Sequence, residues 1–140
     1  MVDPAPTPAE YRAAESLRAA VREFLHRGER AARRAGLTPQ RQLLLLMVKG
    51  APDGSERASV GDLAQRLHLA QNTVTELVAR AEAAGLLQRE GSETDGRVVY
   101  LRLTDEGERR LAATVSELRA DRRTLVEVLG HAAAEAPGHP

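Results

Sequence analysis

The stretch that decides the fold is residues 59–107, SVGDLAQRLHLAQNTVTELVARAEAAGLLQREGSETDGRVVYLRLTDEG. Its first half predicts two short helices, because apolar side chains recur every three or four residues on either side of the turn His68-Leu69-Ala70. Ser59 is suited to cap the first helix, and Gly85 to end the second. Two helices joined by so short a turn are the pattern of a helix-turn-helix.

The second half of the stretch predicts a β-hairpin. Residues 86–90 and 97–103 have the composition of strands, and the second run alternates apolar and polar side chains. Asp95-Gly96 is a common turn dipeptide, and Arg97 follows it at the predicted hairpin tip. A hairpin directly after a helix-turn-helix makes a winged helix. Such a unit presents a helix sized for the DNA major groove and an arginine that can reach the backbone or the minor groove.

Long amphipathic helices are predicted on both sides of this unit. Thr7-Pro8-Ala9-Glu10 is a capping box that starts a helix running to about Ala35. A second helix starts at Thr38-Pro39, and its centre, residues 43–48, is apolar all round and is expected to be buried. Thr104 starts the last helix, in which Arg122 interrupts the apolar stripe and predicts a kink or break near Asp121.

The predicted order is α-α-α-α-β-β-α, a mainly α chain with a small β-wing. Apolar stripes on both terminal helices need a partner surface, and the simplest partner is a second copy in a two-fold homodimer. The predicted divisions are a disordered N-terminus (1–7), an N-terminal dimerisation helix (8–36), the winged helix-turn-helix (37–103), a C-terminal dimerisation helix (104–130) and a disordered tail (131–140).

Composition excludes several classes of protein. The chain has 140 residues and no cysteine, so disulfides and thiolate metal sites are absent. Its four histidines are scattered, and no nucleophile elbow, phosphate loop or metal-ligand spacing occurs, so we expect neither an enzyme nor a cofactor. No apolar run approaches the ~18 residues of a membrane span, and the N-terminus has no export leader. A cytoplasmic protein without membrane contact is therefore expected.

Charge alone does not indicate a nucleic-acid binder. The chain carries 20 basic and 20 acidic side chains, for a formal net charge of zero. Residues 59–103 are also close to neutral, although a strongly basic winged helix would be the usual expectation. Binding to DNA must therefore depend on a few placed arginines.

At this point the chain resembles the MarR-type winged-helix transcriptional regulators, over about residues 10–125. The order and spacing of its motifs carry the resemblance: Leu37-Thr38 with the leucine-rich second helix, SVGDLAQRL (59–67), NTVTELV (72–78), GLLQR (85–89), DGR (95–97) and LRLTDEG (101–107). The resemblance implies an obligate dimer, double-stranded DNA with a pseudo-palindromic operator as partner and, in many members, release of DNA by a small-molecule effector.

The resemblance also implies roles for individual residues. The recognition helix would place Gln71, Asn72, Thr73 and Thr75 on base edges and phosphates, and Arg80 is expected on the same outward face. Arg97 would be the wing arginine, and Asp95 would hold it in position by a charge-assisted hydrogen bond. These residue types suit the task, because Asn and Gln pair bidentately with adenine and Thr contacts a thymine methyl or a phosphate.

The chain departs from the family pattern at two positions. Ala70 replaces the serine that often caps the recognition helix, at a cost of about 1 kcal/mol. Glu76 is an acidic residue on the outward face, and it has two interpretations: an ion pair with Arg80 four residues later, which is the favoured one, or acceptance of a hydrogen bond from a cytosine amino group.

The preferred interpretation is a dimeric DNA-binding regulator that represses by covering a promoter. The alternative is a winged-helix protein–protein interaction module that has kept the dimer and lost DNA binding, which Glu76 and the near-neutral charge motivate. An effector pocket would have few aromatic side chains for its walls, since the chain has only Tyr11, Phe24 and Tyr100, and leucine and methionine are the other wall residues.

Overall fold

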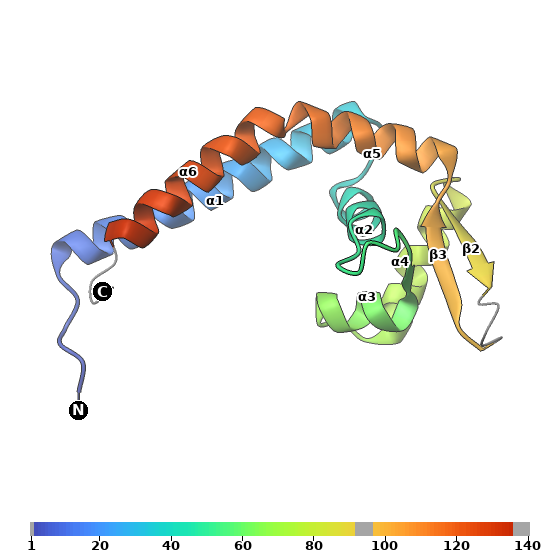
Figure 1. The fold of residues 1–140 in the computed structure, drawn as a ribbon, viewed down its shortest axis with the longest axis horizontal. Helices are drawn as coiled ribbons and strands as arrows, with labels where there is room; N and C mark the ends of the chain where they lie inside the picture. Colours follow the sequence, from blue (N-terminus) through green and yellow to red (C-terminus); the bar gives the residue numbers. More distant parts are fainter. Residues whose placement is uncertain (1, 92–96, 136–140) are drawn as a thin grey trace.

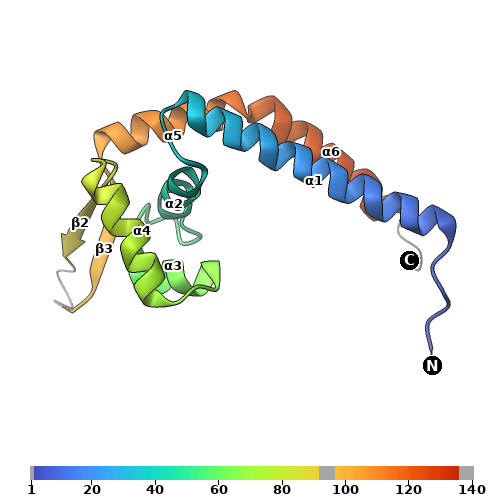
Figure 2. The ribbon, with the colours of Figure 1, turned by 180° about the vertical axis from the view of Figure 1, so that it is seen from behind.

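Two long helices lie side by side and form an arm, from which the rest of the chain projects on one side (Figures 1 and 2). The computed structural model describes residues 2–91 and 97–135. The elements are α1 (Pro8–Arg34), α2 (Pro39–Lys49), β1 (Ala58–Ser59), α3 (Val60–Leu67), α4 (Gln71–Ala83), β2 (Leu87–Gly91), β3 (Val99–Leu103), α5 (Asp105–Glu117) and α6 (Arg119–Glu135).

The arm consists of α1 and α6, which run in opposite directions (Figure 1). The capping box predicted for α1 is confirmed, because Thr7 accepts from the backbone NH of Glu10 and the Glu10 carboxylate accepts from that of Thr7. Two ion pairs join α1 to the C-terminal helices. Arg27 Nη1 lies 2.6 Å from Asp121 Oδ1, and Arg34 Nε lies 2.7 Å from Glu117 Oε1.

We call residues 37–103 the head. Its three-stranded antiparallel sheet has the order β1-β3-β2, and Leu87 pairs with Leu103. Helices α2, α3 and α4 pack against this sheet, because each has one apolar face. The core includes the following buried apolar residues: Leu37, Leu44, Leu45, Val48, Ala58, Leu63, Val74, Val78, Ala81, Leu86, Leu101, Leu103 and Leu111. The predicted winged helix with long flanking helices is therefore confirmed.

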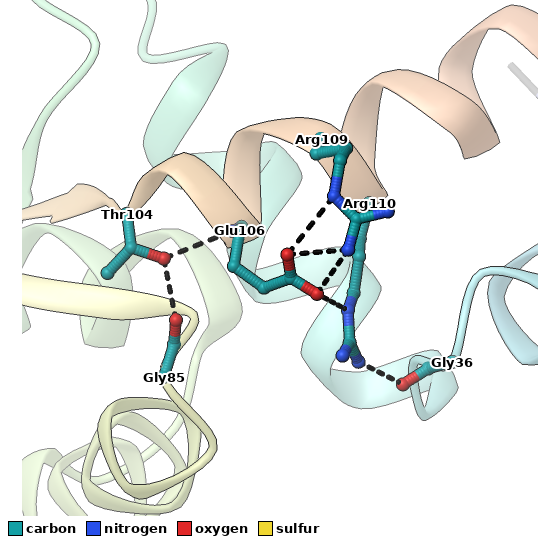
Figure 3. A network of polar contacts seen from close by, with 7 residues as sticks. Gly36, Gly85, Thr104, Glu106, Arg109 and Arg110 are labelled. Atoms are coloured by element: carbon teal, nitrogen blue, oxygen red, sulfur yellow. Dashed lines mark hydrogen bonds and ion pairs between the residues drawn. The ribbon is translucent and has the colours of Figure 1, made fainter.

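Helix α5 connects the head to the arm through a network of polar contacts (Figure 3). The Thr104 hydroxyl donates to the Gly85 carbonyl at 2.6 Å and accepts from the Gly107 amide at 3.0 Å. Glu106 accepts from Arg109 and Arg110, and Arg110 Nη1 also donates to the Gly36 carbonyl at 3.0 Å. The start of α5 is thus tied both to the end of α4 and to the turn between α1 and α2.

The C-terminal helix differs from its prediction. A break at Leu118 divides it into α5 and α6, three residues before the predicted position at Asp121. The Arg122 guanidinium turns back and donates to the Val115 carbonyl at 2.7 Å, so a side chain satisfies a backbone acceptor next to the break. Helix α6 then continues to Glu135, beyond residue 130, where the sequence predicted a disordered tail to begin. Helix α6 lies beside α1 (Figures 1 and 2).

Helix α2 is also less buried than predicted. Leu44, Leu45 and Val48 belong to the core, but Leu43 is 46% exposed and Leu46 is 40% exposed. One side of α2 meets β3, α1, α4 and α5, and the side that carries Leu43 and Leu46 is exposed.

Candidate nucleic-acid interface

The helix-turn-helix is formed by α3 and α4. The Ser59 hydroxyl and the Asp62 carboxylate form a capping box that fixes the start of α3. His68 ends the helix in the left-handed region, with φ 55° and ψ 42°, which confirms its prediction as a turn residue. Asp62 and His68 therefore have local structural roles.

The exposed face of α4 has Asn72 and Glu76 at its centre. Val74 and Val78 are fully buried, so they mark the side of α4 that faces the core. With about 100° per residue, Asn72, Glu76 and Ala79 lie on the opposite side of the helix. All three are exposed. We call Asn72, Glu76 and Ala79 the central strip of α4.

Hydrogen bonds orient two of the predicted recognition residues. Asn72 Oδ1 accepts from the Thr73 amide at 3.0 Å, so the amide nitrogen of Asn72 is the group left to reach a base. Thr75 Oγ1 donates to the Gln71 carbonyl at 2.8 Å, which leaves its methyl group as the outward contact. Thr73 itself is exposed.

The other two predicted residues lie at the edges of α4. The Gln71 side chain is directed toward α3, since a Cβ built on Gly61 would lie 3.5 Å from Gln71 Nε2. Arg80 is exposed and, with Arg41 of α2, lines a small cavity of about 100 Å³. The favoured ion pair between Glu76 and Arg80 is not formed: among the described residues neither side chain has an ion pair.

The N-terminus of α4 has no side-chain cap. Ala70 occupies the capping position with extended backbone, φ −66° and ψ 146°, and makes no side-chain hydrogen bond. The prediction from the sequence is confirmed. The backbone NH groups of Gln71 and Asn72 are therefore available to an anion, which is how helix N-termini bind phosphate, whereas the Thr73 amide already donates to Asn72 Oδ1.

The wing places Arg97 close to the start of α3. Arg97 is exposed and lines a cavity of about 300 Å³ together with Ser59, Gly61 and Arg89. The Arg89 guanidinium also donates to the Glu82 carboxylate at 3.1 Å. The sequence analysis did not predict a functional role for Arg89, although the alternation of side chains along β2 could have placed it on the same face as the wing arginine. Asp95 lies outside the described residues.

Carboxylates neutralise much of the positive charge on the outer side of the sheet. Arg102 pairs with Glu90 across β2 and β3. The Arg57 guanidinium lies 4.0 Å from the centre of the Tyr100 ring and 4.0 Å from Glu90 Oε1. Tyr100 therefore packs against Arg57, and its ring is a cation–π partner.

Clusters of metal-ligating side chains are not found in the described part of the chain. Over residues 2–91 and 97–135, no group of three or more His, Asp or Glu side chains is placed to hold a metal ion. Within the same two ranges, no helix combines the length and the apolar character that a membrane crossing requires.

Comparison with known proteins agrees with this geometry. A sequence profile described as "MarR family" matches residues 35–98. No curated protein sequence matches the chain.

Solved structures extend the likeness over nearly the whole chain. AbsC, a MarR family transcriptional regulator from Streptomyces coelicolor, superposes with a TM-score of 0.69 at 23% identity, covering 96% of this chain and 86% of AbsC. The transcriptional regulator Tm0710 from Thermotoga maritima gives 0.62 at 27% identity, covering 83% and 76%. A mutant of MepR from S. aureus, bound to an oligodeoxyribonucleotide, gives 0.64 at 20% identity, covering 81% of each chain. The chain thus has the winged-helix fold of the MarR-type regulators, and its segment 35–98 matches the MarR family profile.

Proposed function

We propose that this protein is a homodimeric, cytoplasmic transcription regulator that binds a pseudo-palindromic DNA operator and represses by covering a promoter. One observation carries the proposal: the start of α4, the start of α3 and the wing arginine meet around Gly61, which lies next to Gln71 and lines the same cavity as Arg97. A duplex whose major groove holds α4 would then have its backbone within reach of the wing.

The arm supports the homodimer. Its two helices bury little of their own apolar surface, since Ala31 and Ala32 are the buried residues of α1 and none is buried among the α6 side chains that the structure describes. Several large apolar side chains along the arm are exposed instead: Tyr11, Val21, Leu25, Val126 and Leu129. A second arm would cover them, and the two-fold axis would place two α4 helices about one DNA turn apart.

The contacts to DNA would come from a few side chains at defined positions. Arg89 and Arg102 are already paired with carboxylates, so they add little to a general positive field. We therefore assign base contacts to Asn72 and Thr75, contacts of the flanking backbone to Gln71, Thr73 and Arg80, and the wing contact to Arg97, with Asp95 as its support.

The test is fluorescence anisotropy with the purified full-length protein and labelled DNA fragments from upstream of its own gene, titrated with salt and competed with random duplex. Tight binding to one fragment that random duplex does not displace supports the regulator. Micromolar or absent binding to every fragment, from a folded dimer, would instead support the protein–protein interaction module.

Two substitutions separate the roles of α4 and the wing once an operator is found. Asn72→Ala should cost ~1–3 kcal/mol at one base position only, because a base-edge contact is lost. Arg97→Ala should weaken binding to all sequences and reduce the salt slope by about one. Arg12→Ala, which removes the same charge from the arm, is the control. A uniform loss from Asn72→Ala over all sites would contradict its assignment.

Release by a small acidic effector is a second proposal, based on the cavity between α2 and α4. Arg41 and Arg80 provide positive charge and Leu44 and Leu77 provide apolar wall, while the volume of about 100 Å³ is below that of usual ligand pockets and admits only a very small acid. A ligand there would touch the recognition helix directly. We expect benzoate or acetate at millimolar concentration to raise the melting temperature, and Arg41→Gln to remove the effect. An unchanged melting temperature with both acids would contradict this route.

A further inference from the structure

Glu76 is an unpaired carboxylate at the centre of the exposed face of α4. It lies one turn after Asn72 on the central strip, and the side chain is exposed. Among the described residues it has neither an ion pair nor a hydrogen bond from a neighbouring side chain. Arg80 stands at the four-residue step where it could pair with Glu76, but it lines the α2–α4 cavity instead. No contact within the described chain therefore occupies the Glu76 carboxylate.

Insertion of α4 into the major groove would bring this carboxylate against base edges. An ionised carboxylate only accepts hydrogen bonds, and its desolvation is costly unless it meets a donor. In the major groove guanine presents two acceptors, and thymine an acceptor and a methyl group. Adenine places an acceptor beside its amino group, whereas cytosine presents the N4 amino donor alone. Cytosine is the base whose edge matches an acceptor without repulsion.

We infer that Glu76 determines sequence specificity by accepting a hydrogen bond from a cytosine N4 amino group, which places one C·G pair in each half of the operator. This inference rests on the proposed function and specifies one base pair in each half of the proposed operator. Four residues of helix rise about 6 Å and base pairs are about 3.4 Å apart, so the cytosine should lie within about two base pairs of the base that Asn72 contacts. Ala79, the next residue of the central strip, is small and permits close approach of the helix.

The experiment is selection of bound sequences from a randomised duplex library by the full-length protein, followed by measurement of affinity for the selected site and for its single-base variants. Three proteins are compared: the wild type, Glu76→Gln and Glu82→Gln. Glutamine keeps the size of the side chain and its helix propensity, but it removes the charge and adds a donor that suits adenine. Glu82→Gln removes the same charge from the same helix, at a carboxylate that pairs with Arg89.

We expect the wild type to favour cytosine over adenine by about 10-fold or more at one position of each half-site. Glu76→Gln should abolish or reverse that preference and leave the other positions and the melting temperature unchanged. Glu82→Gln should keep the cytosine preference. If Glu76→Gln raised the affinity equally for all sequences, Glu76 would only repel the DNA. The inference would then fail, while the proposed function as a DNA-binding regulator would still hold. If the wild type selected no sequence, the proposed function would fail and this inference with it.

Discussion

Glu106 is the residue on which the contacts between head and arm converge. Two guanidinium groups meet its carboxylate, and Arg110, whose Nε lies 2.7 Å from Glu106 Oε1, also reaches the Gly36 carbonyl (Figure 3). Hydrogen bonds from Arg109 and then Arg110 lower the pKa of Glu106 below its ordinary value of 4.5. In the same way, the hydrogen bond from Arg34 lowers the pKa of Glu117. Both carboxylates are thus more acidic in the folded chain than in the unfolded one.

Acid should therefore destabilise the protein through these groups. A carboxylate whose folded pKa is depressed contributes stability above its unfolded pKa, here 4.5, and this stability is lost as the pH falls further through the folded pKa. Thermal melts between about pH 7 and pH 3 should show the melting temperature falling below about pH 4.5. Glu106→Gln should make the fall shallower. Glu29→Gln, at an exposed carboxylate of α1, is the control, and an equal effect from both variants would contradict the role of Glu106.

Gly107 lies so close to the Leu86 carbonyl that only a residue without a Cβ fits at this position. A Cβ built on Gly107 would lie 2.3 Å from the Leu86 carbonyl oxygen, which is backbone and cannot turn aside. We expect Gly107→Ala to destabilise the chain by about 1–3 kcal/mol or more, because α5 must move off the head. Urea unfolding measures the change. The matched control is Gly130→Ala in α6, where nothing lies within 4 Å of the new Cβ and helix propensity should raise stability by about 0.5–1 kcal/mol.

Contacts between individual side chains were the features that the sequence predicted least well. Periodicity placed Asn72, Thr75 and Glu76 on the outward face of α4 correctly, because that depends only on which residues are apolar. The predicted ion pair between Glu76 and Arg80 was wrong, since Arg80 instead lies beside Arg41 of the neighbouring helix α2 and lines the same cavity. Similarly, Arg27 meets Asp121 only because α1 and α6 lie side by side, and spacing along the chain carries no sign of that.

Secondary-structure elements were predicted far better than contacts. Thr7, Thr38, Ser59 and Thr104 all cap helices as predicted, because a capping residue acts within three or four positions of itself. The elements that differ depend on tertiary packing. The break at Leu118 and the extension of α6 to Glu135 lie in the part of the chain that packs against α1, and single-sequence patterns do not contain that contact.

The start of α4 has no side-chain cap, and a serine at position 70 should supply one. Ala70→Ser supplies a hydroxyl at a capping position whose backbone is already extended, so the free energy of unfolding should rise by about 0.5–1 kcal/mol. Chemical unfolding of the free protein measures this gain. The reverse change in α3, Ser59→Ala, removes an existing cap and should lower stability by a similar amount. If Ala70→Ser gave no gain, the hydrogen bond from the Thr73 amide to Asn72 Oδ1 would already satisfy this turn.

The whole molecule consists of a head with a core and an arm that lacks one. Leu25 is 58% exposed and Val126 is 66% exposed, which is unusual for large apolar side chains on two packed helices. The proposed dimer would bury both. The arm would then be stable only in the presence of its partner, and dissociation and unfolding would be coupled.

Substitution on the arm tests the dimer. Leu25→Glu and Val126→Glu place a charge where an apolar contact is proposed, so sedimentation equilibrium should give the monomer mass at concentrations where the wild type gives twice that mass. Arg18→Glu, at an exposed position of α1, should leave the mass unchanged. A wild-type chain that sediments as a monomer at high micromolar concentration would contradict the dimer and the two-fold operator.

The break at Leu118 has a consequence for how relatives of this protein could diverge. Leu111 of α5 belongs to the core of the head, whereas α6 belongs to the arm, so this joint sets the direction of one relative to the other. One residue inserted there would turn α6 by about 100° and move it by about 1.5 Å. In a dimer such a change would alter the separation of the two recognition helices, and with it the spacer length between operator half-sites. New operators could thus evolve through insertions at one position, without any change in α4, the proposed recognition helix.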